Sequence, residues 1–382
     1  MLVVSPSLPL PFATADSRWT HLLVRELAHA GFDLAVLAIS RDGAPEVARA
    51  RSRMGEYGVR FAHAPFQVDH RTVTRKARSL LRPNSEYLMG SAARATFELE
   101  AARAKWVHVE TLHPARLLPT TGTPGSVHVH QLDEIDWQLA AGLRWRWRRL
   151  RARRSSRQVL ALPDVILTHS ESVLAHVRSY ATARAECLPI GIDTRMYVRV
   201  GSGGRRLRAG IIGSMFWHPS AMAARHAALR VWPKVRRSLP DAELFVAGWG
   251  ADRCLADLRS LPGITVQSDL SCPSEFFGAV DVLLYLPGGG TGAKVKVLES
   301  LAYGLPVVTD RYGAEGLVQE GVPPVIVVAN DDEAAQNVVR LLMNAGERER
   351  LARRGRDFLE EHHGPRVVAK YWAPVLQDVL AR

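Results

Sequence analysis

The sequence has few of the features that mark several classes of protein. Only three of its 382 residues are cysteines, Cys187, Cys254 and Cys272, and their spacing matches neither a metal site nor a Cys-x-x-Cys motif. A disulfide framework is therefore excluded, and we expect reduced thiols. No apolar run approaches the ~18 residues that span a bilayer, and the first residues do not resemble a signal peptide. We therefore expect a cytoplasmic protein, soluble or peripheral at the inner face of the membrane.

Acidic residues are also in short supply. Against 50 lysines and arginines there are only 38 aspartates and glutamates, which gives a net charge of +12. This balance predicts an anionic partner, which could be a nucleotide, a phospholipid surface or a nucleic acid. Aromatic residues make up 7% of the chain and hydrophobic residues 47%, which is ordinary for an α/β protein, and the length predicts two domains.

Strand and helix signals alternate along both halves of the chain, which predicts parallel sheets covered by helices. In the first half, a helix over residues 19–27 that ends at Gly31 and a long helix from about Asp133 to Leu162 separate some of the strands. Strands are expected near Val3, at 32–39, 59–66, 106–110, 126–130, 165–168 and 187–190. In the second half they are expected at 209–212, 244–247, 264–266, 282–286, 307–309 and 325–328, with helices to about His363.

A polar, glycine-rich stretch between Asp193 and Arg208 predicts a linker between these halves. The predicted fold is therefore α/β, with two doubly wound, Rossmann-like domains at residues 1–195 and 205–365. The amphipathic helix at 366–382 is expected to pack back on the N-terminal domain. Two such domains joined by a linker place a ligand in a cleft at the carboxyl ends of both sheets.

The stretch from Gly288 to Leu317 combines a glycine loop, a helix and a further strand after a buried apolar run. A glycine loop that enters a helix presents free backbone N–H groups and the positive end of the helix dipole, so it predicts an anion site, most naturally for phosphate. Lys294 is flanked by Ala293 and Val295, which excludes a P-loop. The third glycine of a dinucleotide fingerprint is also missing.

The segment Gly292-Ala-Lys294-Val-Lys296-Val-Leu-Glu299-Ser-Leu-Ala-Tyr-Gly304-Leu-Pro, closed by Gly313-Ala-Glu315-Gly316, resembles the donor-binding segment of the retaining GT-B glycosyltransferases of family four, the group 1 glycosyltransferases. The resemblance implies the GT-B fold, an N-terminal acceptor-binding domain and a C-terminal domain that binds a nucleotide sugar. It also implies that Glu299 binds the ribose. Thr291 stands where many members have a second glutamate.

Lys294 and Lys296 are the expected diphosphate ligands and catalytic cations, because lysines at a helix N-terminus are unfavourable unless an anion offsets them. Positions two residues apart lie about 200° apart on a helix, so both can reach one diphosphate only if the first is still in the loop. As an alternative to ribose binding, Glu299 could pair with Lys296 across one helical turn.

Further donor-side residues follow the strands of the second half. The turn Gly213-Ser214-Met-Phe-Trp-His-Pro resembles the first glycine turn of one branch of the family, with Ser220 in place of the branch's asparagine. It lacks the Arg and Lys of other branches, so the positive charge must come from Lys294 or Lys296. The remaining expected donor-binding residues are Gly248, Asp269, Gly290, Thr291 and Gly292, although loop glycines at strand ends are also common without ligands.

In the first half, His128 and His130 alternate with valines and therefore share one face of a strand. His130, at the carboxyl end of that strand, is the candidate to orient or deprotonate an acceptor hydroxyl, although a lone histidine is usually structural. Glu110 and His113 are rivals at the end of the preceding strand. The other expected acceptor-side residues are Asp133, Arg18 and Asp16, and Asp16 could instead cap a helix.

Arg144 to Arg157 contains eight arginines, two tryptophans and no acid. Such a helix is a solvated face, or it binds anionic lipid headgroups, and nucleic-acid binding gives the same composition.

The expected function is transfer of a hexose from a UDP- or GDP-linked sugar to a hydroxyl, with retention, no metal and no other cofactor. The Asp-x-Asp metal motif is absent from the sequence, which agrees. A nucleotide-sugar epimerase of the same fold and a basic nucleic-acid-binding protein are the alternatives. The second of these does not explain residues 292–315, so no nucleic-acid partner is expected.

Overall fold

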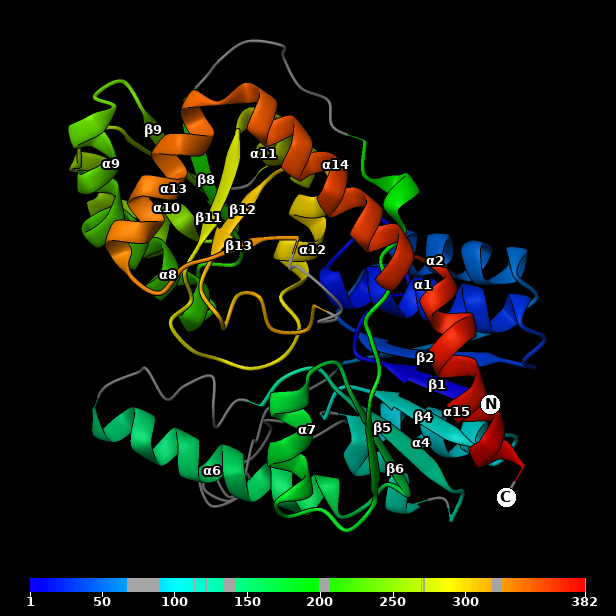
Figure 1. Ribbon diagram of the computed structural model, residues 1–382. Helices are drawn as coiled ribbons and strands as arrows, with labels where there is room; N and C mark the ends of the chain where they lie inside the picture. Colours follow the sequence, from blue (N-terminus) through cyan, green and yellow to red (C-terminus); the bar gives the residue numbers. More distant parts are fainter. Residues whose placement is uncertain are drawn as a thin grey trace. The chain divides into compact units, whose positions relative to one another are not determined.

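The computed structural model describes residues 1–66, 90–112, 114–120, 122–132, 142–198, 207–268, 270, 272–317 and 324–381 (Figure 1). These residues form two compact units. The first contains the described residues up to Gly191 and those from Pro365 onward, and the second contains those from Ile192 to Gly364. Two of the expected acceptor-side residues, Asp133 and His113, and the donor-side Asp269 lie outside the described residues.

The first unit is built on a seven-stranded parallel sheet with the strand order β3-β2-β1-β4-β5-β6-β7. Its register is fixed by pairs such as Val109 opposite Val127. The inner strands are fully buried, as expected for strands covered on both faces, although β4 contains His108 and Glu110. The strands are β1 (Leu2–Ser5), β2 (Ala35–Ser40), β3 (Arg60–Pro65), β4 (Val107–Glu110), β5 (Gly125–Val129), β6 (Val165–Thr168) and β7 (Arg184–Cys187).

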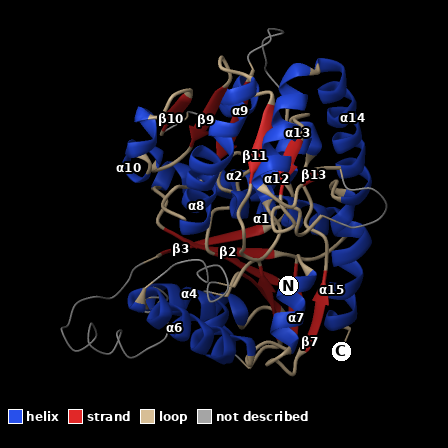
Figure 2. Cartoon of the chain, turned by 60° about the vertical axis from the view of Figure 1, so that its left-hand side comes forward, coloured by secondary structure: helices blue, strands red, loops and turns tan. Residues whose placement is uncertain are grey.

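The helices of this unit connect and cover the strands (Figures 1 and 2). The first of them begins where the Thr14 side chain accepts a hydrogen bond from the Ser17 amide, so Thr14 and not Asp16 caps it. It ends before Gly31, which has a φ of 87°. The helical segments are α1 (Ala15–His29), α2 (Ala44–Glu56), α4 (Ser91–Ala101), η2 (Pro114–Thr120), α6 (Leu143–Leu160), α7 (Glu171–Arg178), η6 (Val368–Trp372) and α15 (Ala373–Leu380).

The second unit has a six-stranded parallel sheet with the order β10-β9-β8-β11-β12-β13. Its strands are β8 (Arg208–Ile212), β9 (Glu243–Ala247), β10 (Ile264–Gln267), β11 (Val282–Tyr285), β12 (Val307–Thr309) and β13 (Ile326–Val327). Its helical segments are η3 (Thr194–Met196), α8 (His218–His226), η4 (Ala227–Val231), α9 (Trp232–Ser238), α10 (Ala251–Cys254), η5 (Ala256–Ser260), α11 (Pro273–Ala279), α12 (Val295–Ala302), α13 (Asp331–Met343) and α14 (Ala345–His362).

The two parallel sheets with their helices confirm the predicted α/β, Rossmann-like fold class. One expected strand was wrong, because β7 ends at Cys187, where the sequence-based strand 187–190 was expected to begin. The reason is that β7 is an edge strand with exposed or half-exposed polar residues, including Arg184 and Glu186, so it lacks the apolar run used to recognise a buried strand. The apolar residues at 188–190 form the connection that follows it.

The expected linker is only partly described, because residues 199–206 lie outside the described ranges. The part before it is packed within the second unit. Asp193 is buried and caps η3, and the ring of Tyr197 contacts that of Tyr303. Among the described residues, no helix is both long and apolar enough to cross a membrane.

In both sheets the strand order reverses beside the first strand of the unit, between β1 and β4 and between β8 and β11. Ligands of doubly wound sheets bind at this reversal, outside the carboxyl ends of the strands. In the second unit, the Gly213 turn follows β8 and the glycine loop 288–294 follows β11. Both expected donor-binding segments therefore flank the reversal point.

Gly210 in β8 shows how closely the second sheet packs on α11. A Cβ atom at Gly210 would lie 2.6 Å from Val280 Cγ1 and 2.7 Å from Phe276 Cζ. We predict that Gly210→Ala lowers the free energy of unfolding by about 1–3 kcal/mol through overpacking. Differential scanning calorimetry would detect the lower melting temperature.

The matched control is Gly346→Ala in α14, where the nearest atom to a new Cβ is 3.7 Å away. This change is expected to be neutral or to stabilise by about 0.5 kcal/mol, because it reduces the entropy of the unfolded chain. A Gly210→Ala protein that melts no earlier than the wild type would contradict the packing argument.

Candidate functional site

The glycine loop after β11 ends at the start of α12. Gly288, Gly290 and Gly292 have φ values of 66°, 102° and 79°, a left-handed conformation that glycine adopts without strain. Thr291 is buried between the last two. Lys294 occupies the N-cap position with φ −90° and ψ 87°, and the helix begins at Val295. Lys294 is therefore still in the loop, which is the condition under which both lysines can reach one ligand.

Lys294 holds the loop together from inside. Its Nζ atom donates hydrogen bonds to the carbonyl oxygens of Thr291 at 2.9 Å and of Gly292 at 2.7 Å. It also lies 3.6 Å from Glu315 Oε2, and both side chains are largely buried. Glu315 thus supplies an internal anion for this cation at the helix N-terminus, so a bound phosphate is not needed to explain Lys294.

Lys296 reaches across to the turn after β8. Its Nζ atom donates to Ser220 Oγ at 2.9 Å and lies 4.3 Å from the centre of the Tyr285 ring. A Cβ atom at Gly213 would lie 2.8 Å from this Nζ atom, so a larger residue there would displace the tip of the lysine. Lys296 therefore joins the two segments that flank the reversal point of the sheet.

The pKa of Lys296 is lowered to about 7. The main cause is burial of the ammonium group, and the neighbouring charge of Lys294 lowers it further, whereas Glu299 raises it. Glu299 lies one turn further along α12 and is itself buried, with 7% of its surface exposed. A cation that is poorly solvated in the free protein gains most when an anion binds beside it.

The two glycine turns after β8 and β9 are packed against each other. The Gly213 amide donates to the Ala247 carbonyl at 3.1 Å, and the Met215 amide donates to Trp249 at 2.8 Å. Gly248 has a φ of 122°, and a Cβ atom there would lie 2.2 Å from the Gly213 oxygen. This contact gives Gly248 a structural role. Ser214 closes the turn by accepting a hydrogen bond from the Trp217 amide at its carbonyl.

In the first unit, the carboxylate of Glu110 lies at the centre of a buried polar cluster. Its Oε1 atom accepts hydrogen bonds from His108 Nε2 at 3.1 Å and Trp19 Nε1 at 3.2 Å, and its Oε2 atom accepts from His128 Nδ1 at 2.8 Å and His130 Nε2 at 2.7 Å. Burial opposes ionisation, but the electrostatic interaction with His128 and the hydrogen bonds from the three histidines hold the pKa of Glu110 well below its usual range. Glu110 is therefore an ionised carboxylate.

This cluster changes the expected role of Glu110. With only 1% of its surface exposed and four donors around it, Glu110 lies beneath His130 and positions that ring. His130 is 16% exposed, and its Nδ1 atom lies 4.0 Å from Asp16 Oδ1. Burial lowers the pKa of His130, but the hydrogen bond to Glu110 and its charge outweigh this effect and raise it. Arg18 is half-buried and lies two residues further along α1 than Asp16.

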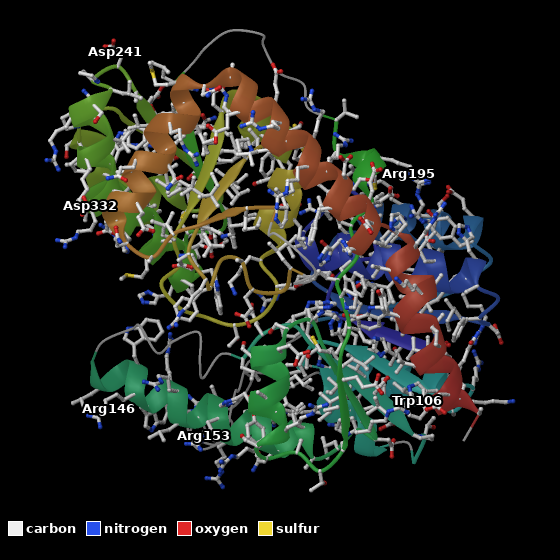
Figure 3. All side chains as sticks on the ribbon, in the orientation of Figure 1. Trp106, Arg146, Arg153, Arg195, Asp241 and Asp332 are labelled. Carbon is white, nitrogen blue, oxygen red and sulfur yellow. The ribbon has the colours of Figure 1, made fainter. Side chains whose placement is uncertain are left out.

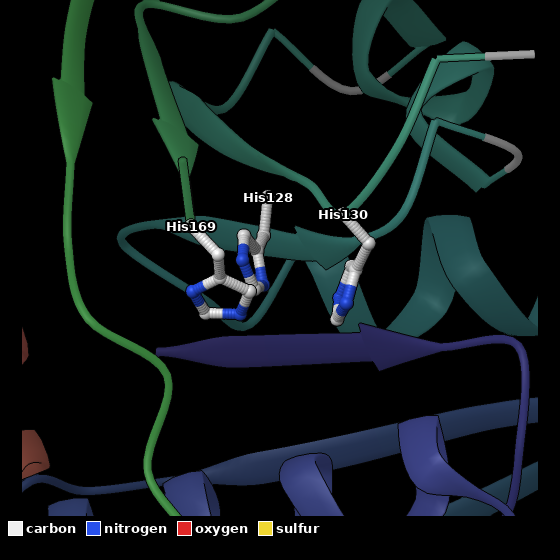
Figure 4. Close-up of side chains that lie close together, drawn as sticks. All are labelled: His128, His130 and His169. Atoms are coloured by element: carbon white, nitrogen blue, oxygen red, sulfur yellow. The ribbon is translucent and has the colours of Figure 1, made fainter. Parts of the chain in front are cut away.

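His128 and His169 complete the cluster, and Figure 4 shows their rings beside that of His130. Burial lowers the pKa of His128 to about 3, and it lowers that of His169 well below the usual value. Both rings are therefore neutral near pH 7. The His169 Nδ1 atom donates to the Leu188 carbonyl at 3.0 Å.

Several residues of these two clusters were not predicted from the sequence. His108 was missed, although it alternates with valine and with the expected Glu110 in β4 in the same way as His128 and His130 at β5, and this repeat could have indicated it. His169 follows β6 directly, so its position at the carboxyl edge of the sheet could also have been predicted from the sequence. The partnerships of Ser220 with Lys296 and of Glu315 with Lys294 had no sequence signal, because they depend on how loops far apart in the chain meet.

Comparison with known families gives two matches that together span most of the chain. Residues 17–196 match the family described as Glycosyltransferase Family 4, and residues 206–344 match Glycosyl transferases group 1. No curated protein sequence matches the chain.

Similar solved structures cover the whole chain at low sequence identity. Sucrose-phosphate synthase from Thermosynechococcus elongatus aligns with a TM-score of 0.71 and 12% identity, over 100% of this chain and 99% of that one. HepE from Anabaena, solved in complex with UDP and glucose, aligns with a TM-score of 0.65 and 11% identity over the same shares. WaaG, a glycosyltransferase involved in lipopolysaccharide biosynthesis, aligns with a TM-score of 0.64 and 15% identity, over 98% and 99%.

The lowered pKa of Lys296 predicts that anion binding depends on pH. An anion beside Nζ stabilises the ammonium form, so binding takes up a proton, and affinity falls as pH rises through about 7. The loss is expected to reach up to about tenfold per pH unit above that value. Calorimetric titration with inorganic pyrophosphate, in buffers of different ionisation enthalpy, measures both the affinity and the number of protons taken up on binding.

Lys296→Met serves as the control, because it removes the titrating group and leaves the ionisation of pyrophosphate unchanged. The difference between the two proteins therefore isolates Lys296. An identical pH profile in both would show that this ammonium group does not meet the anion.

Proposed function

The chain belongs to the group 1 glycosyltransferases of the GT-B fold, and we propose that it transfers a hexose from a UDP- or GDP-linked sugar to an acceptor hydroxyl with retention of configuration. We further propose that the departure of the nucleotide diphosphate needs no metal ion. The observation that carries the proposal is the position of Lys296, half-buried between the glycine loop and the Gly213 turn. HepE, of similar fold, has been solved with UDP-glucose, which supports a nucleotide-sugar donor.

The donor site must stabilise negative charge on the departing diphosphate while the anomeric carbon becomes cationic. The N-terminus of α12 and the ammonium group of Lys296, in the first turn of this helix, both supply positive charge that is in place before the reaction. Such preorganised groups stabilise the leaving group without reorganisation cost. Lys294 contributes by holding the loop and adding charge, and buried Glu299 supplies a carboxylate for the ribose hydroxyls.

The proposed acceptor side lies in the first unit, at His130. Glu110 binds Nε2 of this ring, so Nδ1 is the atom left to orient an acceptor hydroxyl. Asp16, half-exposed and 4.0 Å from Nδ1, is the second polar group at this position. The acceptor itself is not specified by these residues, because a hydroxyl of a lipid-linked sugar, a polysaccharide or a small molecule presents the same hydrogen bond.

We predict that Lys296→Ala lowers kcat/KM for the nucleotide sugar by at least tenfold, because a charge-assisted hydrogen bond in a dry site is worth more than ~1.4 kcal/mol. Steady-state kinetics with UDP- and GDP-sugars and a panel of hydroxyl acceptors would measure the loss. Proton NMR of the product, which is expected to keep the anomeric configuration of the donor, would test retention.

Lys234→Ala is a matched control in the same unit, because Lys234 forms a surface ion pair with Asp332. It should leave the kinetics unchanged. Full activity of a folded protein in which both Lys294 and Lys296 are replaced would refute the assignment of the donor site. Isomerisation of the sugar nucleotide without any acceptor would favour an epimerase instead.

Helix α6 adds a proposed second property, binding to an anionic membrane surface. It contains no acidic residue, and Arg146 and Arg153 extend from it into solvent (Figure 3). Leu143, Trp147 and Leu150 are 81%, 46% and 66% exposed and are spaced four and three residues apart, so they form an apolar stripe. A basic helix with an exposed apolar stripe is typical of helices that lie in the interface of anionic bilayers.

We predict that the full-length protein sediments with vesicles that contain phosphatidylserine and much less with vesicles of phosphatidylcholine alone. Arg146→Glu combined with Arg153→Glu should weaken this binding at least tenfold, because each basic residue near the surface contributes ~1 kcal/mol. Arg49→Glu combined with Arg53→Glu in α2 makes the same charge change on another helix and is the control. Equal loss in both double variants would indicate a general charge effect and not a role of α6.

A further inference from the structure

Three imidazole rings meet at the carboxyl edge of the first sheet. One ring nitrogen from each of His128, His130 and His169 lies within 4.8 Å of those of the other two. His128 and His130 come from alternate positions at the end of β5, and His169 directly follows β6, which pairs with β5. Figure 4 shows the three side chains lying close together. The group is therefore built by the sheet and not by a surface loop.

The hydrogen bonds of these rings follow a recognisable pattern. His128 Nδ1 and His130 Nε2 bind the carboxylate of Glu110, and His169 Nδ1 binds the carbonyl of Leu188. Metal-binding histidines almost always donate one ring N–H to a carboxylate or a backbone carbonyl, because this fixes the ring and makes the other nitrogen more basic. All three histidines have such a partner.

The second nitrogens of the two buried rings lack a partner. Neither His128 Nε2 nor His169 Nε2 has a hydrogen bond to any residue that the structure describes, although the two residues are only 0% and 3% exposed. A buried polar atom without a partner is unfavourable and is rare in folded proteins. In a neutral imidazole whose Nδ1 carries the proton, Nε2 carries a lone pair, and this lone pair can bind a metal cation.

We propose that His128, His130 and His169 bind one divalent transition-metal ion, Zn²⁺ in the first instance, with Glu110 and the Leu188 carbonyl as the outer groups that hold the rings. Imidazole nitrogens suit zinc, copper, nickel and iron, whereas magnesium and calcium require oxygen ligands. Three histidines with a fourth position open to water are a known zinc arrangement.

Binding requires only a small contraction of the cluster. Zinc–nitrogen bonds are about 2.0–2.1 Å in a tetrahedral site, so ligand nitrogens lie roughly 3.3 Å apart. The ligand nitrogens, within 4.8 Å of one another, must therefore close by up to about 1.5 Å, which rotation of the side chains can supply. His130 is the member that reaches solvent, and Asp16 lies beside it. The fourth position therefore faces this side, where water or the Asp16 carboxylate would occupy it.

This ion belongs to the first unit and is separate from the proposed diphosphate site on Lys296. The two proposals share His130 and its neighbours Glu110 and Asp16, and a bound ion and an acceptor hydroxyl would compete for His130. The metal site is tested without donor, acceptor or turnover, so its failure and failure of the proposed function can be told apart.

The test uses the full-length protein without a histidine tag. After removal of metal with a chelator and dialysis against Zn²⁺, elemental analysis is expected to find one zinc per chain. Titration of the metal-free protein with Co²⁺ should produce the visible absorption of a tetrahedral, nitrogen-ligated ion, and X-ray absorption should show imidazole scattering. These measurements on the wild type do not depend on whether any variant folds.

Substitutions then locate the site. His169→Gln and His128→Gln should each lower the affinity for Zn²⁺ at least tenfold, while His29→Gln, which changes an exposed histidine at the end of α1, should not. Circular dichroism in the presence of chelator shows whether each variant is folded. The proposal is overturned if the wild type takes up less than about one-tenth of an equivalent of zinc and shows no cobalt spectrum, or if folded His128 and His169 variants bind zinc as the wild type does.

Discussion

The structure depends on one constraint: in each sheet all strands run parallel, so every strand delivers the residues that follow it to the same edge. At the edge of the first sheet, Glu110 ends β4, and His130 and His169 follow the adjacent strands β5 and β6. At the edge of the second, the Gly213 turn and the glycine loop follow β8 and β11, which are neighbours because the strand order reverses there. Both clusters of polar residues are products of this arrangement.

Within each cluster, one buried charge determines what its neighbours can do. A buried carboxylate is costly unless hydrogen bonds satisfy it, and Glu110 has four donors, which keeps it ionised and fixes the rings around it. In the second unit, Lys294 and Lys296 have different surroundings. Lys294 is paired with Glu315 and with loop carbonyls. The ammonium group of Lys296 contacts the hydroxyl of Ser220 and the ring of Tyr285, neither of which carries a negative charge. Lys296 therefore gains more from a bound anion.

Much of the fold was predictable because strands buried on both faces leave continuous apolar runs. Two contrasting strands show this. β11 was recognised from the run that precedes the glycine loop, whereas β7 was misplaced because its edge position leaves polar residues along it. The alternative that Asp16 caps α1 was wrong, because Thr14 and Asp16 are both good capping residues and only the observed helix start distinguishes them.

Local residue patterns and strand direction were enough to predict the fold class, the glycine loop with its two lysines and the position of His130 at a strand end. Three contacts could be seen only in the folded chain: Lys294 is held by Glu315, Lys296 meets Ser220, 76 residues away, and Glu110 lies beneath His130. These contacts join segments that are distant in the chain. Their geometry depends on strand order and loop packing, which no local pattern of residues records.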